Sequence, residues 1–169
     1  MRRHIKRLRS ENGQALVEFA FVIPLVMLFL FGVIDFGLAI NQQNADTNIA
    51  NVAVREAAVI GSTTSESCGG QTFYTLDTWT ECESTLMGGP QGITVCMGDI
   101  ATGSSPTSNY TQGDPIKVEV SSQFSWLKVI TQKVGTLTSH IGANATMRLE
   151  DYPSSGGNSF LTNTPVCPS

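Results

Sequence analysis

A long apolar run near the amino terminus constrains this chain more than any other feature of its sequence. Residues 19–34 are sixteen consecutive residues without a charged or amide side chain. With its flanks, from Ala15 to Phe36, the run reaches the roughly 20 residues that an α-helix needs to cross a bilayer. Pro24 is tolerated inside such a helix, and proline kinks many helices. The sequence therefore predicts a transmembrane helix over residues 14–37.

Charge is distributed unevenly on the two sides of this run. Residues 1–13 contain five Lys/Arg and one Glu, a sum of +4, whereas residues 14–169 contain five Lys/Arg and thirteen Asp/Glu, a sum of −8. A basic segment of this size is compatible with nucleic-acid binding. Directly before an apolar helix, however, it is typical of the cytoplasmic side of a membrane. We therefore expect a basic cytoplasmic leader over residues 1–13, a membrane partner and no nucleic-acid partner.

Two other uses of the apolar run are compatible with the sequence. Gly37, Leu38 and Ala39 form a small-x-small triplet, so that signal peptidase cleavage after Ala39 would release a secreted binding domain. The run is longer than a typical signal-peptide core and Asp35 lies just before the triplet, which argues against this cleavage. An uncleaved protein anchored by a single span is the other alternative. The amino terminus of the mature protein distinguishes these possibilities.

The segment after the run, residues 38–60, has the pattern of an amphipathic helix. Its apolar side chains recur at steps of three and four residues, at Ala45, Ile49, Val52, Ala53, Ala57 and Ile60. The stretch from Asn41 to Asp46, together with Arg55 and Glu56, is assigned to the polar face. Because no Pro or Gly follows Gly37 before Ile60, the sequence allows one continuous helix or two helices with a break near Gly37.

A region rich in Ser, Thr and Gly begins at Gly61 and is typical of loops with short strands. Three segments within it alternate apolar and polar residues with period two. Their apolar residues are Ile93, Val95 and Met97, then Ile116, Val118, Val120 and Phe124, and finally Ile141, Ala143, Ala145, Met147 and Leu149. Three strands with one apolar face need a cover, and the apolar stripe of the preceding helix matches it. We therefore predict an α+β fold in which a long amino-terminal helix packs on a small antiparallel sheet.

Two further segments of this region have weaker patterns. The apolar residues Trp126, Leu127, Ile130 and Val134 are compatible with a short helix or turn. Residues 151–169 have the composition of a loop that only a cysteine near its end would hold in place.

The four cysteines, Cys68, Cys82, Cys96 and Cys167, all follow the apolar run. None forms a C-x-x-C pair, and His140 is the only histidine on that side of the run, so the pattern does not favour zinc. An even number of cysteines outside the cytoplasm instead predicts two disulfides, in any of three connectivities. Free thiols in a reducing compartment are the alternative. The prediction makes residues 61–169 an extracytoplasmic, disulfide-containing, β-rich domain.

Catalytic patterns are not found in the sequence. There is no G-x-S-x-G motif, no cluster of His, Asp and Glu at metal-binding spacing and no phosphate-binding glycine loop. His4 and His140 stand alone in the sequence, one on each side of the apolar run. We therefore expect neither enzymatic activity nor a cofactor.

The stretch GQALVEFAFVIPLVMLFLFGVIDFG carries a family resemblance. Its glycine at Gly13, the Glu18-Phe19 pair, the proline inside the span and the closing Gly32-Val-Ile-Asp35-Phe-Gly37 resemble the TadE/TadF-like pilus assembly proteins, pseudopilins of the tight-adherence (Flp) system. The resemblance implies a pilin-like fold and a structural role in pilus assembly at the bacterial inner membrane. It also implies cleavage by a prepilin peptidase after Gly13 and contacts with other pilins and the pilus secretion machinery.

The resemblance further implies a role for the acid at the head of the span. After cleavage Gln14 becomes the first residue, Glu18 the fifth and Phe19 the sixth, and the Glu18 carboxylate pairs with the Gln14 α-amine of a neighbouring subunit. Two unit charges about 4 Å apart attract by about 4 kcal/mol at an effective dielectric constant near 20, before desolvation. The alternative is an interfacial glutamate at a helix amino terminus, which the helix dipole stabilises by less than about 1 kcal/mol.

Overall fold

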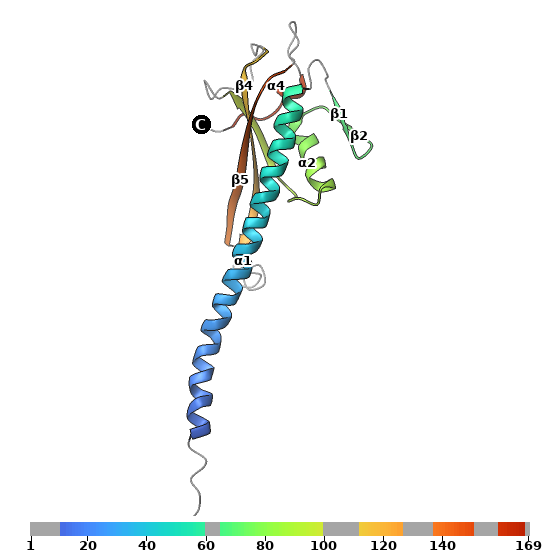
Figure 1. The fold of residues 1–169 in the computed structure, drawn as a ribbon. Helices are drawn as coiled ribbons and strands as arrows, with labels where there is room; N and C mark the ends of the chain where they lie inside the picture. Colours follow the sequence, from blue (N-terminus) through green and yellow to red (C-terminus); the bar gives the residue numbers. More distant parts are fainter. Residues whose placement is uncertain (1–10, 60–64, 100–111, 127–136, 151–158, 168–169) are drawn as a thin grey trace, which may run out of the picture. The chain divides into compact units, whose positions relative to one another are not determined.

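A computed structural model describes residues 11–59, 65–99, 112–126, 137–150 and 159–167 of the chain. Its helices are α1 (Glu11–Val59), α2 (Leu76–Leu86) and α4 (Ser159–Thr162). Its strands are β1 (Glu66–Cys68), β2 (Gln71–Phe73), β3 (Thr94–Asp99), β4 (Pro115–Trp126) and β5 (Leu137–Arg148). These elements form an antiparallel β1–β2 hairpin and an antiparallel sheet of order β3-β4-β5 (Figure 1). The predicted α+β fold with a long amino-terminal helix and a small antiparallel sheet is confirmed.

Helix α1 is continuous through both Pro24 and Gly37. Of the two possibilities that the sequence allowed at Gly37, the structure therefore has the single helix. The chain nevertheless divides into two compact units, residues 1–38 (unit 1) and residues 39–169 (unit 2), and α1 contributes to both. In unit 1 the described apolar side chains of α1 are exposed around the whole helix. Lipid would cover such a surface if the segment spans a membrane.

The sheet of unit 2 buries one face of its central strand. In the register of the sheet, Val95 lies opposite Val120 and Val118 lies opposite Ala145. The predicted inward residues of β3 and β4, and of the position just before β3, are confirmed as buried: Ile93, Val95, Met97, Ile116, Val118, Val120 and Phe124. In β4 these residues alternate with more exposed ones, because successive side chains of a strand point to opposite faces. In β3, Cys96 between Val95 and Met97 is buried as well.

The part of α1 that belongs to unit 2 covers this apolar face (Figure 1). The helix residues in the common core with β3 and β4 are Ile49, Ala50, Ala53, Val54, Ala57 and Ala58. Four of the six are alanines, whose small side chains let the helix backbone approach a close-packed sheet. The predicted packing of the helix on the sheet is confirmed, but the buried stripe is wider than the sequence analysis proposed, because Ala50, Val54 and Ala58 also belong to it.

Three predictions about unit 2 are wrong. Met147 was expected to face the core, but it is 37% exposed because β5 lies at the edge of the sheet. The loop-rich region after Gly61 contains α2, whose Leu76 and Trp79 are buried. The segment 151–169, expected to be a loop, contains α4 with the buried residues Phe160 and Leu161.

Other predictions concern residues that the structure describes only in part. Trp126 is the last residue of β4 and does not begin a helix. The rest of the predicted short helix or turn, from Leu127 to Val134, lies outside the described residues, as do Ile60 and residues 1–10 of the predicted leader.

Candidate processing and assembly site

The residues of the predicted processing site lie together at the start of α1. Gly13 and Gln14 are the third and fourth residues of the helix, which begins at Glu11. Gln14 and Glu18 are one turn apart, and the Gln14 Nε2 donates a hydrogen bond to the Glu18 Oε1 at 3.3 Å. Glu18 and Phe19 are exposed in the single chain. The Glu18 carboxylate is therefore accessible to a second subunit.

The predicted scissile bond, between Gly13 and Gln14, lies in the first turn of the described helix. The first amide groups of a helix have no partner within it, so opening this turn breaks few hydrogen bonds. A Cβ placed on Gly13 would have no heavy atom within 4 Å. The fold of the single chain therefore does not require a glycine here, and an effect of a side chain at Gly13 would have to come from a partner such as a peptidase.

Two disulfides are present in unit 2, as the number and position of the cysteines predicted. Cys68 is bonded to Cys82, and Cys96 is bonded to Cys167. The first bond joins β1 to α2 across a sequence separation of 14. The second joins β3 to the carboxy-terminal segment across a separation of 71. The structure thus selects one of the three connectivities that the sequence left open.

The carboxy-terminal disulfide lies beside an acidic side chain. The sulfur atoms of Cys96 and Cys167 and a carboxylate oxygen of Glu119 lie within 4.8 Å of one another, as ligands of a metal ion would. Both sulfur atoms are used in the disulfide, however, so neither is a thiolate that could bind a metal. Glu119 forms an ion pair with Lys117 on the same strand.

Asp46 forms a buried polar contact between α1 and β4 that the sequence analysis missed. The prediction that Asp46 lies on the polar face of the helix is wrong, because its side chain is 0% exposed. The Ser122 Oγ donates to the Asp46 Oδ2 at 2.7 Å and accepts a hydrogen bond from the Gln42 Nε2 at 2.6 Å. Among the described residues, no hydrogen-bond partner reaches the buried Asp46 Oδ1. Helical spacing could have indicated that Asp46 is buried, because Asp46 lies one turn before the buried residues Ile49 and Ala50.

The pKa of Asp46 is raised above its usual value mainly because burial disfavours the charged carboxylate, while the hydrogen bond from Ser122 offsets part of this rise. The pKa of Glu56, further along the same helix, is raised as well. Burial is again the main cause, with repulsion from Glu66 and Glu83 in addition and attraction to Arg55 against it. Both acids therefore resist ionisation in the folded chain.

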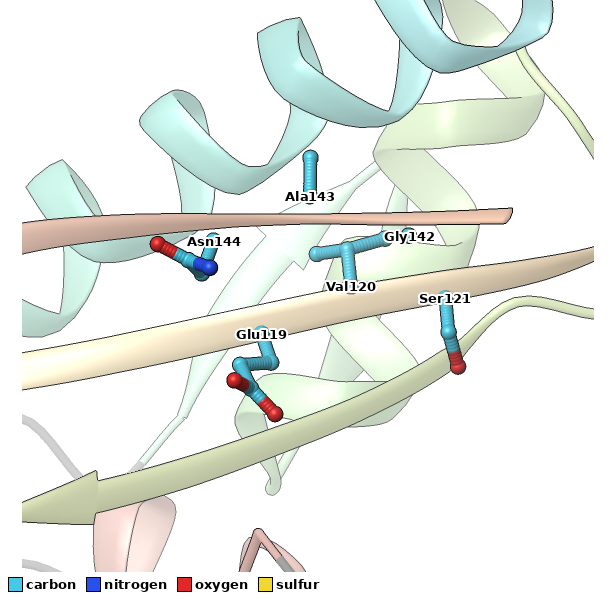
Figure 2. Close-up of a pocket in the computed structure, with 6 residues that line it drawn as sticks. All are labelled: Glu119, Val120, Ser121, Gly142, Ala143 and Asn144. Atoms are coloured by element: carbon cyan, nitrogen blue, oxygen red, sulfur yellow. The ribbon is translucent and has the colours of Figure 1, made fainter. Parts of the chain in front are cut away.

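A hollow of about 230 Å³ lies between β4 and β5, lined by Glu119, Val120, Ser121, Gly142, Ala143 and Asn144. Figure 2 shows Glu119 and Ser121 pointing away from the helix and Ala143 pointing toward it. A Cβ on Gly142 would lie 3.1 Å from the Val120 carbonyl oxygen and 3.3 Å from the Ser121 Cβ. The glycine therefore allows the two strands to approach closely here and leaves a depression on the polar face of the sheet.

Comparison with known families identifies the segment that contains the candidate processing site. Residues 13–58 match the family model described as TadE-like protein. This segment is TadE-like. The match begins at Gly13, includes Gln14, Glu18 and Phe19, and confirms the resemblance found in the sequence. It indicates a protein related to the Tad pilus and implies association with the machinery of that pilus.

Searches of curated proteins and of solved structures found no match to the chain. Within the described residues, α1 is long and apolar enough to cross a membrane, by length and composition. The TadE-like segment thus contains a candidate membrane anchor as well as the candidate processing site.

Proposed function

We propose that the chain is a TadE-like minor pilin or pseudopilin, a membrane-anchored structural component in the assembly of tight-adherence (Flp-type) pili. A prepilin peptidase removes the leader after Gly13, and residues 14–37 hold the protein in the bacterial inner membrane with unit 2 in the periplasm or outside the cell. The role is structural and not enzymatic, and its partners are other pilins and the pilus secretion machinery. The family match over residues 13–58 carries this proposal.

The geometry of the TadE-like segment supports a role for Glu18 in assembly. Glu18 is exposed on α1, one turn from the residue that cleavage would make the amino terminus. The new α-amine of Gln14 would be largely protonated at neutral pH. A carboxylate inside an apolar span is costly in a single chain, and pairing with the α-amine of a neighbouring subunit lowers that cost. Glu18 therefore favours subunit contacts in which the two groups meet.

Release by signal peptidase after Ala39 is the alternative, and two observations favour the Gly13 site over it. The bond after Ala39 lies in the interior of α1, where opening the helix breaks hydrogen bonds on both sides, and Ala39 itself is buried in unit 2. The family match also continues from residue 13 to residue 58 across this bond, which supports a mature protein that retains both parts of α1.

The processing step is tested by intact mass and amino-terminal sequencing of the full chain, produced with and without a prepilin peptidase. We expect the parent to begin at Gln14 when the peptidase is present, and Gly13→Val to keep the leader because the added side chain crowds the scissile bond in the peptidase. Gly32→Val is the matched control, because a Cβ at that glycine also has no heavy atom within 4 Å. It should be processed like the parent. A parent chain that begins at Ile40, or that keeps Met1 with the peptidase present, would contradict the proposal.

The assembly role is tested by substituting Glu18. Glu18→Ala and Glu18→Gln should insert into the membrane, because removing a charge makes the span more apolar. They should still be trimmed, at least in part, but give few or no pili, and Glu18→Asp should be intermediate because its charge is retained on a shorter side chain. The precursor-to-mature ratio and the surface filaments are measured in the same cells. If Glu18→Gln assembled as many pili as the parent, charge pairing would not be the role of this residue.

A further inference from the structure

We propose that unit 2 contacts the membrane surface through the end of the β4–β5 pair, with Trp126 and Leu137 of the sheet and Ile40 of α1 against the lipid headgroup region. This inference rests on the proposed membrane anchor and adds a second, lateral contact with the lipid. It concerns the described residues of the two strand ends and of the helix beside them.

Hydrogen bonds place this end of the sheet beside the start of unit 2. The Gln42 Nε2 donates to the Ser122 Oγ at 2.6 Å and to the Gln123 carbonyl oxygen at 3.4 Å. At the other end of the helix, the Glu150 amide donates to the Ala58 carbonyl oxygen at 2.9 Å. Since Pro115, the first residue of β4, lies opposite Arg148, strand β4 runs antiparallel to the helix, from the level of Ala58 toward that of Gln42.

The last residues of β4 extend past the contact with Gln42. Trp126 follows Ser122 by four residues, a distance of about 13 Å along a strand. Ala39 precedes Gln42 by three residues, which is about 4.5 Å along a helix. The end of β4 therefore reaches at least the level of Ala39, where unit 2 begins. Since residue 39 follows directly after the candidate span, this end of unit 2 is the one joined to the membrane anchor.

The side chains at this end suit a lipid interface. Trp126 and Leu137 are opposite each other in the register, and Leu137 is 63% exposed. Ile40 is 44% exposed on the helix. The Trp126 side chain is partly exposed. Its ring packs edge-to-face on Phe124 with the ring centroids 4.9 Å apart, and its Nε1 donates a hydrogen bond to the Ser139 Oγ at 2.7 Å. Tryptophan with a satisfied N–H is favoured where an apolar layer meets water.

The described segments at this end of unit 2 lack acidic and strongly basic side chains. The segments 36–45, 121–126 and 137–147 contain no Asp, Glu, Lys or Arg. Asp46, which follows the first of them, is fully buried and presents no charge to the surface. The opposite end of the unit carries Arg148 and Glu150. Lys128 and Lys133, between the two strand ends in sequence, lie outside the described residues. The described part of this end, uncharged and partly apolar, avoids the cost of desolvating ions at the lipid and the repulsion of acidic groups by anionic headgroups.

The two tryptophans of the chain give a direct test. The full chain is placed in vesicles of phosphatidylethanolamine and phosphatidylglycerol, with or without phosphatidylcholine brominated just below its headgroup. Trp79→Phe leaves Trp126 as the emitter, whereas Trp126→Phe leaves the core residue Trp79. We expect the emission of Trp126 to fall in brominated vesicles and that of Trp79 to stay unchanged. Should Trp79→Phe fail to fold, the difference between the parent and Trp126→Phe gives the same quantity.

A matched control places a tryptophan at the other end of unit 2. Val59 is 45% exposed at the end of α1, and Val59→Trp in a chain without the two native tryptophans should show no quenching by the brominated lipid. Leu137→Asp should weaken the quenching of Trp126. A chain that floats with the vesicles but shows no quenching of Trp126 would overturn the inference while leaving the anchor intact, and this end would then face water or a protein. A chain that does not float would overturn the proposed anchor and the inference together.

Discussion

Asp46 is buried between the helix and the sheet of unit 2 with one carboxylate oxygen unpartnered among the described residues. A buried polar atom without a partner costs on the order of 1–3 kcal/mol. Because the pKa of Asp46 is raised in the folded chain, the folded state favours the neutral acid. The stability that this preference contributes is fully present below the ordinary aspartate pKa and is lost as the pH rises through the raised value. Glu56 contributes in the same direction.

Asp46→Asn should therefore reduce the pH dependence of stability. We expect the free energy of unfolding of the full chain in detergent micelles to fall less steeply with rising pH in this variant. At neutral pH the variant should be more stable than the parent by on the order of 1 kcal/mol, because no charge remains to be buried. Urea unfolding followed by tryptophan emission over a pH series measures this. Glu81→Gln is the control, since Glu81 is exposed on α2. An unchanged pH slope in Asp46→Asn would assign the dependence to other groups.

At the scale of elements, the sequence predicted the features that depend on the spacing of apolar residues. It missed the features that depend on which elements lie beside one another. The inward residues of β4 follow from spacing, and the structure confirms them. The buried stripe of α1 is confirmed in part, since Ala50, Val54 and Ala58 belong to it in addition to predicted residues. The exposure of Met147 follows from the edge position of β5, which a period of two cannot show. Helix α2 was missed because its sequence, LDTWTECESTL, is rich in polar residues with modest helix propensity, and it buries few large apolar side chains. The disulfide between α2 and β1 also holds the helix in place, and the local sequence of the helix does not show which cysteine is its partner.

The two disulfides should differ in how much they stabilise unit 2. On the chain-entropy estimate, the sequence separations of 14 and 71 correspond to about 3 kcal/mol for Cys68–Cys82 and about 4.4 kcal/mol for Cys96–Cys167. The second bond also holds the segment with the buried residues Phe160 and Leu161. Paired Cys→Ser variants compared by urea unfolding should therefore show the larger loss at Cys96 and Cys167. Equal losses would mean that loop length does not control the difference, and unchanged stability in both would mean that the bonds constrain little.

At the scale of the whole molecule, the sequence predicted an apolar span and an amphipathic helix that packs on a sheet, and it left open whether one helix or two contain them. In the structure both segments belong to α1. The core of unit 2 contains residues from Ile49 onward, so it draws nothing from residues 1–38. The TadE-like segment was recognisable because Gly13, Glu18 and Phe19 belong to a local motif that the family match includes. The contact of Asp46 with Ser122 was not recognisable, because it joins residues 76 positions apart.

A chain reduced to residues 39–169 should therefore fold without its membrane segment. Removing residues 1–38 deletes most of the exposed large apolar side chains of α1 but none of the common core. We expect a soluble monomer with both disulfides, cooperative thermal unfolding and resistance to protease, measured by gel filtration, thiol titration and circular dichroism. A chain that begins at Ile49 is the control. It keeps the core residues but loses Gln42 and Asp46, so that Ser122 is left without its two helix partners and the helix is shorter by ten residues. It should unfold at a lower temperature. If the 39–169 chain aggregated or unfolded without cooperativity, unit 2 would depend on the membrane segment, and its compact core would not be sufficient for folding.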